Sequence, residues 1–212
     1  MAQEPKWRRR KEDRPNEIIA AALEIFAQRG FSAARLEDVA ARAGVSKGTL
    51  YLYFPSKEEL FKAVIRQTIL ANVETAEREV AASEAPTRQL LTMLLGGMMG
   101  ALAQTRAGVI PRLIIGEAHN FPDLVRFYSD EVIARGLSLM TRVIERGVRR
   151  GEVRNVDAFM SAHTVIGPLL LLAIWKTVFE PYTDRTLDAD QYLKTYTDLI
   201  LNGLLSPAAQ GD

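Results

Sequence analysis

The chain of 212 residues contains no cysteine and only two histidines, His119 and His163. The lack of cysteine excludes disulfide bonds, thiolate metal sites and cysteine-based redox sensing. Neither histidine has a second one three or four residues away, so a zinc site would depend on carboxylates. We therefore predict no metal and no cofactor. The basic N-terminal residues precede no apolar run, which is not typical of a secretory signal, and we expect a cytoplasmic protein.

Sequence motifs of the common enzyme classes are missing as well. The chain has no G-x-S-x-G, no Walker loop and no dinucleotide-binding fingerprint. Catalysis by the neighbouring Glu117 and His119 is the remaining enzymatic hypothesis. We predict that the protein is not an enzyme, with a small helical enzyme and an architectural DNA-binding protein as the alternatives.

No strand-like alternation of apolar and polar residues is present, whereas apolar residues recur with a helical period nearly throughout the chain. An all-α fold follows.

Charge is distributed unevenly along the chain. Residues 1–70 hold 13 Lys and Arg against 9 Asp and Glu, and the remainder holds 14 against 17. A basic N-terminal part fits either a surface that faces nucleic acid or a solvated tail.

Local signals predict several helices within the first 83 residues. Gly30 and Gly44 are typical helix stops, and Ser46 and Ser56 are typical N-terminal caps. Ser56 also begins the capping-box pattern "SKEE". A tight glycine turn between the second and third helices is typical of a helix-turn-helix. The expected helices are Pro15 to Gly30, Arg35 to Ala43, a short helix from Ser46 to Phe54, and a long one from Ser56 towards Ser83.

The third predicted helix has an unusual outer face. If Leu50 and Phe54 point inward, Gly48 and Leu52 point most directly outward, with Tyr51 beside them. A DNA major groove provides partners for this set, because glycine permits close approach and an apolar side chain can contact a thymine methyl group. The alternative is that Tyr51 and Leu52 pack against another helix.

The segment "IIAAALEIFAQRGF…LEDVAARAGVSKGTLYLYFPSKEELF", roughly Ile18 to Phe61, resembles the DNA-binding segment of the TetR family of bacterial transcriptional regulators. The resemblance implies an N-terminal three-helix DNA-binding domain on a larger helical domain that binds a ligand and forms a homodimer. Family members commonly contact DNA at the positions of Lys47, Thr49, Tyr51, Tyr53 and Lys57. Relatives often have a Thr pair where this chain has Ala34 and Arg35, and Arg35 replaces a hydroxyl contact or reads a guanine edge. The predicted DNA contacts are Arg35, Ser46, Lys47, Gly48, Thr49, Tyr51, Leu52, Tyr53 and Lys57.

Two parts follow from this pattern, a DNA-binding domain over residues 1–57 and a ligand-binding and dimerisation domain over residues 58–212. The first includes a basic arm, "KWRRRKEDR", for which two readings stay open. It could follow the phosphate backbone or enter a minor groove, or it could be a disordered solubilising tail.

The segment "RLIIGEAHNFPDLVRFY", Arg112 to Tyr128, resembles a C-terminal subgroup of the same family and extends the resemblance over most of the chain. A regulator of this kind needs a cavity lined by bulky or flexible side chains with a few polar groups. Each candidate can equally be an ordinary core residue, and Arg112 can pair with Glu117. The candidates for binding a small molecule are Met93, Leu94, Met98, Leu102, Arg112, Glu117, Phe127, His163 and Trp175.

The run "VIGPLLLLAIW", Val165 to Trp175, is apolar on every side of the helix that it should form. Eleven residues are too few to cross a bilayer, which needs about twenty, so we predict no membrane association. A helix that is apolar all round has to be covered all round, by a partner subunit or wholly within one subunit. We predict a homodimer through this helix and a final helix at about Ala189 to Leu205.

The prediction is a ligand-responsive transcriptional regulator: a homodimeric repressor on double-stranded operator DNA that an apolar or amphipathic small molecule releases. In this mechanism the effector favours a conformation in which the two recognition helices no longer fit successive major grooves.

Overall fold

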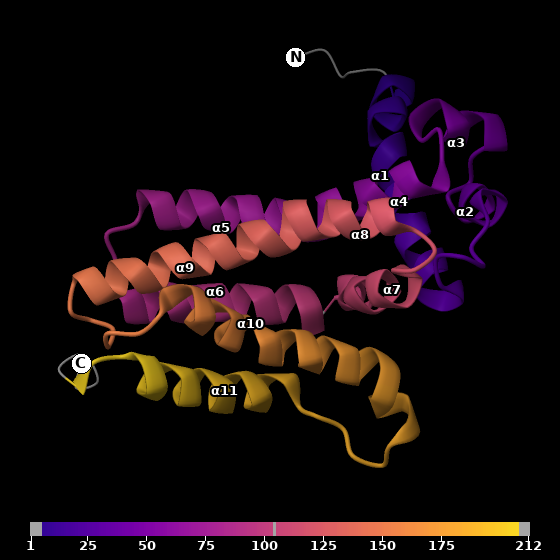
Figure 1. Ribbon diagram of the computed structural model, residues 1–212. Helices are drawn as coiled ribbons and strands as arrows, with labels where there is room; N and C mark the ends of the chain where they lie inside the picture. Colours follow the sequence, from indigo (N-terminus) through magenta and orange to yellow (C-terminus); the bar gives the residue numbers. More distant parts are fainter. Residues whose placement is uncertain (1–5, 104, 208–212) are drawn as a thin grey trace.

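The computed structural model describes the backbone of residues 6–103 and 105–207, and this part of the chain is helical apart from its turns and one isolated bridge between Val153 and Leu205. The helices of residues 6–65 lie at one end of an elongated helical body (Figure 1). The prediction of an all-α fold is confirmed. The first four helices are α1 (Lys6–Arg29), α2 (Leu36–Arg42), α3 (Lys47–Tyr53) and α4 (Lys57–Ile65).

The predicted caps and stops of these helices are present. Ser46 and Ser56 accept hydrogen bonds from the backbone N–H groups three residues later, each at 3.1 Å. Gly30 and Gly44 have φ values of 79° and 66°, the left-handed region that glycine reaches without a steric penalty. Local chemistry therefore fixes where α3 and α4 begin and where α1 and α2 end.

The predicted start of the first helix at Pro15 is wrong, because α1 begins at Lys6 and contains Pro15 in its interior. Pro15 has no backbone N–H to donate to the preceding turn, but its fixed φ of about −65° is compatible with a helix, so α1 loses one hydrogen bond there without ending. The side-chain contacts of the basic cluster Arg8 to Lys11 lie outside the described residues.

The body consists of long helices that run along its length (Figure 1). The described residues contain three π-helical turns: one joins α4 to α5, one joins α8 to α9, and one follows α10. The first two, η1 and η3, pack against each other. The elements are η1 (Arg66–Leu70), α5 (Ala71–Ala82), α6 (Thr87–Ala103), η2 (Arg106–Val109), α7 (Ile110–Glu117), α8 (Pro122–Tyr128), η3 (Ser129–Ile133), α9 (Ala134–Arg149), α10 (Ala158–Ile174), η4 (Trp175–Phe179), η5 (Glu180–Tyr182) and α11 (Ala189–Leu204).

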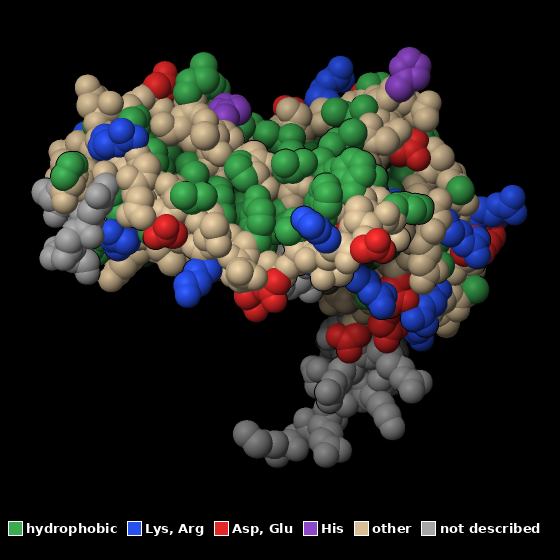
Figure 2. Space-filling model, turned by 90° about the horizontal axis from the view of Figure 1, so that it is seen from below, with side chains coloured by type: hydrophobic (Ala, Val, Ile, Leu, Met, Phe, Trp, Pro, Cys, Tyr) green, Lys and Arg blue, Asp and Glu red, His purple; other side chains and the backbone are tan. Residues whose placement is uncertain are grey.

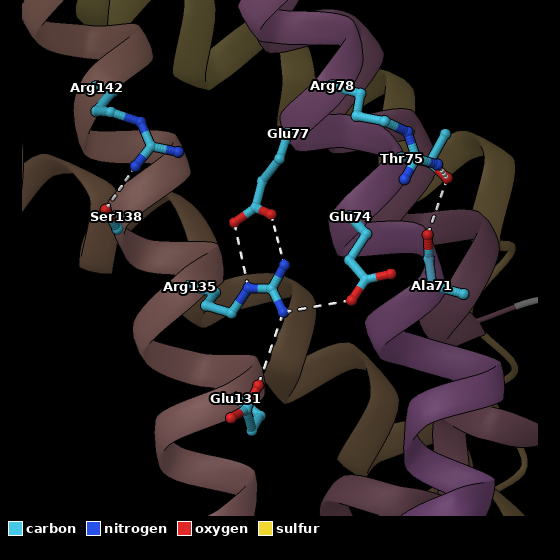
Figure 3. Close-up of polar contacts among 9 residues, drawn as sticks. All are labelled: Ala71, Glu74, Thr75, Glu77, Arg78, Glu131, Arg135, Ser138 and Arg142. Carbon is cyan, nitrogen blue, oxygen red and sulfur yellow. Dashed lines mark hydrogen bonds and ion pairs between the residues drawn. The ribbon is translucent and has the colours of Figure 1, made fainter.

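An ion-pair network joins α5 to α9. The Arg135 guanidinium donates through Nη2 to Glu77 at 2.6 Å and through Nε to the same carboxylate at 3.3 Å. Its Nη1 lies 3.5 Å from Glu74 and 3.7 Å from Glu131 (Figure 3). The bidentate hydrogen bond from Arg135 and its charge hold the pKa of Glu77 below the ordinary value, despite the opposing effect of burial.

Two hydrophobic clusters form the core. One contains the inner faces of α1 to α4 together with residues of η2, α7, α8 and η3, and the other lies among α6, α9, α10 and α11. The side chains of Ile110 and Leu113 on α7 are therefore buried in the same cluster as Phe26 and Leu50 of the DNA-binding helices. The division at residues 57 and 58 stays a prediction, and the first cluster extends across it.

The apolar helix is longer than the eleven residues used to exclude a membrane span. A continuous helical segment covers 25 residues, Ala158–Tyr182, with a hydropathy and length that would suffice to cross a bilayer. The argument from length is therefore wrong. Pro168 lies within α10, which continues beyond it as predicted. This segment packs against α6, α7 and α9 on its inner side.

Candidate DNA-binding surface and effector site

The recognition helix α3 exposes the side chains that the helical period places outward. Leu50 and Phe54 are buried, whereas Tyr51 is 41% exposed and Leu52 is 85% exposed. In the described structure these two side chains are thus not covered by another helix, contrary to the alternative reading. A Cβ atom added at Gly48 would meet only the Ser46 hydroxyl, at 3.9 Å. Nothing in the fold requires glycine at this position.

Most of the other predicted DNA contacts also lie on the surface. Arg35 precedes α2, is exposed and caps no helix through its side chain. Lys47 forms an ion pair with Glu37 and lies 5.8 Å above the Tyr51 ring. The hydrogen bond from Lys47 and its charge lower the pKa of Glu37. The pair is exposed, so phosphate groups can compete for Lys47 at little cost. Ser46 and Gly48 are exposed, and Thr49 and Tyr53 are half-buried.

Lys57 is placed differently from the expected outward position. Its ammonium donates to the backbone carbonyls of Phe31, Ser32 and Ala34, at 2.8, 2.9 and 3.2 Å. It also lies 4.7 Å from the centre of the Phe31 ring. A lysine that satisfies three carbonyls holds the loop between α1 and α2. Lys57, predicted only as a DNA contact, therefore also stabilises the fold.

The nine candidates for the effector site are not brought together in one place. Leu94, Met98 and Leu102 on α6 belong to the second hydrophobic cluster, with Met93 on the more exposed side of the same helix. Phe127 packs on the first cluster, where Arg66 lies 4.9 Å from its ring centre. Two hollows on the surface, one between α10 and α11 and one between α9 and the start of α10, are lined by none of the nine.

Two polar candidates have partners in the DNA-binding part. Glu117 accepts hydrogen bonds from Ser32, and Arg112 donates to the carbonyl of Ala27 at 3.4 Å. The alternative that Arg112 pairs with Glu117 is not found among the described contacts, in which each residue has its own partner. His163 is exposed on α10, with its Nδ1 2.9 Å from the carbonyl of Phe159.

Arg112 and Trp175 share a feature that fits a binding site. The Nε of Arg112 and the Nε1 of Trp175 are buried and have no hydrogen-bond partner among the described residues. Buried donors without a partner are costly, and each such group calls for an explanation. Arg112 lies on α7, which packs against α10, and Trp175 directly follows α10.

The outer face of α10 and α11 is apolar, and no described residue covers it. Figure 2 shows this face, the lower side in Figure 1, with apolar side chains gathered across its middle. Leu171 is 59% exposed and Leu199 is 66% exposed. Met160 and Gly203 line the hollow between these two helices, and Tyr182 and Phe179 extend the exposed apolar surface. An exposed surface of this kind is typical of an interaction site.

Two family models match the chain. Residues 18–64 match the model "Bacterial regulatory proteins, tetR family", and residues 85–189 match "Tetracyclin repressor-like, C-terminal domain". The chain belongs to the TetR family. The residues that carried the resemblance, including all of α2 and α3, lie within the first match. Members of this family are transcriptional regulators and not enzymes.

Relatives and solved structures agree with this assignment over most of the chain. The HTH-type transcriptional repressor KstR2 of Rhodococcus jostii is 28% identical over 199 residues, which cover 93% of this chain and 94% of the relative. The regulator FadR of Bacillus subtilis in complex with stearoyl-CoA is 20% identical, with a TM-score of 0.74 over 88% of this chain and 97% of that one. A regulator from Saccharomonospora viridis in complex with choline is 21% identical, with a TM-score of 0.76 over 92% of this chain and 99% of that one.

This TetR-family protein is therefore a ligand-responsive, DNA-binding transcriptional regulator. TetR regulators bind operator DNA, form dimers and bind small-molecule effectors. The two structural neighbours bind chemically different molecules, an acyl-CoA and choline, within the same fold. The fold accordingly does not determine the effector of this chain.

Proposed function

We propose that this protein represses transcription in the cytoplasm by binding a palindromic operator as a homodimer, with α3 of each subunit in a major groove. The exposed face of α3 carries the proposal, because it presents Tyr51 and Leu52 to solvent and leaves open space around Gly48. Ser46, Lys47, Thr49 and Tyr53 complete the recognition surface, and Arg35 extends it to the start of α2. Lys57 acts mainly by holding the loop between α1 and α2, and any contact with a DNA phosphate is secondary.

The homodimer forms through α10 and α11 in this proposal. A second copy placed on the same face would cover Leu171 and Leu199 with the equivalent apolar residues, as a two-fold interface requires. The four helices then form a bundle whose apolar faces are buried in its centre. The length and hydropathy of Ala158–Tyr182 are accounted for in the same way, because its outer side is then buried between subunits.

The proposed effector is amphipathic, with an apolar part among the α6 side chains and an oxygen-bearing polar group near Arg112 and Trp175. The buried, unpartnered nitrogen atoms of these two residues support an acceptor such as a carboxylate, a carbonyl or a phosphate. Met98 and Leu102 supply adaptable apolar contacts on a helix that packs against α10. Stearoyl-CoA, which the Bacillus subtilis neighbour binds, has both chemical parts and is a suitable first probe.

A thermal-shift and operator-binding assay tests the proposal with stearoyl-CoA, a free fatty acid, a steroid and choline. An effector that binds one conformation should raise the melting temperature and lower operator affinity together. Trp175→Phe should reduce both responses while leaving operator affinity without effector unchanged. Stabilisation by several of these compounds without any change in operator affinity would contradict effector-controlled release.

A further inference from the structure

Ser32, in the loop between α1 and α2, is held from two directions. Its backbone N–H and its hydroxyl donate to the two carboxylate oxygens of Glu117, at 2.9 and 2.6 Å. Its carbonyl accepts a hydrogen bond from the Lys57 ammonium at 2.9 Å. Glu117 is the last residue of α7, whereas Lys57 is the first residue of α4. One serine thus connects the effector-binding body to the start of the helix that follows the recognition helix.

The loop has little freedom to absorb a displacement of Glu117. Lys57 also holds the carbonyls on either side of Ser32, those of Phe31 and Ala34. The Phe31 ring is fully buried and packs against Phe121, with ring centres 4.8 Å apart. A movement of the α7 end should therefore carry the whole loop with it.

A second contact connects the other end of this segment to the DNA-binding helices. Arg106, at the start of η2, pairs with Glu24 of α1 at 2.6 Å. The same carboxylate accepts a hydrogen bond from Arg42 of α2 at 2.7 Å. The segment from η2 to the end of α7 is thus attached to the DNA-binding helices at both ends, and the apolar side chains of α7 are buried between the two attachments.

Glu117 is suited to a charged contact. Burial by itself would raise the pKa of its carboxyl group, but the hydroxyl and amide of Ser32, the side chain of Asn120 and the Lys57 charge together lower the pKa below its usual value. The carboxylate is therefore ionised at neutral pH. An ionised acceptor forms stronger hydrogen bonds than a neutral one.

We infer that Glu117 is a positioning residue, which fixes the orientation of the DNA-binding helices relative to α7 through Ser32. The inference rests on the proposed function and assigns a residue to its signal transmission. A shift of α7 reaches α2 and α3 through the loop that contains Ser32, because this loop leads directly into α2. In the absence of DNA the contact limits the range of orientations that α3 samples.

Distance measurement between the two recognition helices tests the inference. The chain has no cysteine, so Leu52→Cys provides a single site for a nitroxide label on an exposed position of α3. Double electron–electron resonance on the labelled homodimer, without DNA or effector, gives the distribution of the distance between the two labels. The variants are Glu117→Gln, Ser32→Ala and both together. Asp123→Asn is the matched control, because it removes a charge of the same sign from an exposed pair within α8.

Glu117→Gln and Ser32→Ala should each broaden the distance distribution, whereas Asp123→Asn should leave it unchanged. In the unlabelled proteins, affinity for an operator duplex selected from random DNA should fall by about tenfold, which is near the lower end of the effect of losing one hydrogen bond to a charged group. The double variant should lose less than the sum of the two single losses, because Ser32→Ala removes only the hydroxyl donor to the carboxylate that Glu117→Gln replaces, while the backbone N–H donor stays.

The inference is overturned if Glu117→Gln gives the same distribution of label distances as Asp123→Asn and leaves operator affinity unchanged. It is also overturned if the losses of operator affinity caused by Glu117→Gln and Ser32→Ala add up in the double variant. Circular dichroism and sedimentation establish that each variant remains a folded dimer, and Ser32→Ala decides the matter if Glu117→Gln does not fold. Failure to select any operator would refute the proposed function, while the distance measurement would still test the contact.

Discussion

Gly48→Ala separates a role in folding from a role in DNA binding at the centre of the recognition surface. The added methyl group would lie in open space, 3.9 Å from the nearest side-chain atom, the Ser46 hydroxyl. Alanine favours a helix over glycine by about 1 kcal/mol in a helix interior, and a smaller gain of about 0.5 kcal/mol is expected in the first turn of α3. The melting temperature should rise by about 1–2 °C.

The same methyl group should weaken operator binding, because it separates α3 from the floor of the groove. We expect a loss of at least about tenfold in affinity, or about 1.4 kcal/mol, measured by fluorescence anisotropy on the selected operator duplex. Gly97→Ala is the matched control: this glycine lies in α6, and its added Cβ would also meet no atom within 4 Å. The control should gain about 1 kcal/mol of stability, because Gly97 lies in a helix interior, and keep its operator affinity. If Gly48→Ala bound the operator as tightly as the control, the close approach of α3 to DNA would be refuted.

Three further predictions concern other contacts. Lys57→Ala should lower stability by about 2 kcal/mol in urea unfolding, since three carbonyls lose a charged donor. Lys47→Ala should instead change stability by less than about 0.5 kcal/mol and make the salt dependence of operator binding shallower, and equal stability losses in the two variants would contradict these roles. Leu171→Arg should yield monomers in sedimentation, whereas Ile115→Arg, at a position of equal exposure on α7, should remain dimeric; two dimeric variants would exclude the proposed interface. Arg135 lowers the pKa of Glu77 in the folded protein below the ordinary value of 4.5. Their contact therefore stabilises the protein fully at pH values above 4.5, and this stabilisation is lost as the pH falls through the lower pKa of the folded state. The difference in melting temperature between the native protein and Glu77→Gln should therefore be full at neutral pH and disappear in acid, and a difference independent of pH would show another cause.

Local signals in the sequence predicted the DNA-binding part well. Ser46, Ser56 and Gly44 act within a few residues of themselves, so the limits of α2, α3 and α4 follow from cap and turn chemistry. The exposure of Leu52 followed from the helical period alone. The start of α1 was wrong because proline was taken as a first residue, although a helix can continue in front of it.

Contacts between distant parts of the chain could not be predicted in this way. Ser32 and Glu117 are 85 residues apart, and nothing in the local pattern of either residue indicates the other. Lys57 shows the same limit: its position after α3 suggested a phosphate contact, whereas the loop carbonyls it binds belong to residues 23 to 26 positions earlier. The effector site is the least predictable part, since bulky apolar residues at helical spacing are equally suited to a core.

Selection of bound sequences from random double-stranded DNA tests the central claim most directly. If two α3 helices related by two-fold symmetry read successive major grooves, the selected sites should be inverted repeats with half-site centres about 10 base pairs apart or a multiple of that spacing. Tyr51→Ala should abolish the enrichment while the protein remains a folded dimer. Enrichment of no sequence, or of a single half-site bound equally well by the monomeric Leu171→Arg variant, would contradict the account.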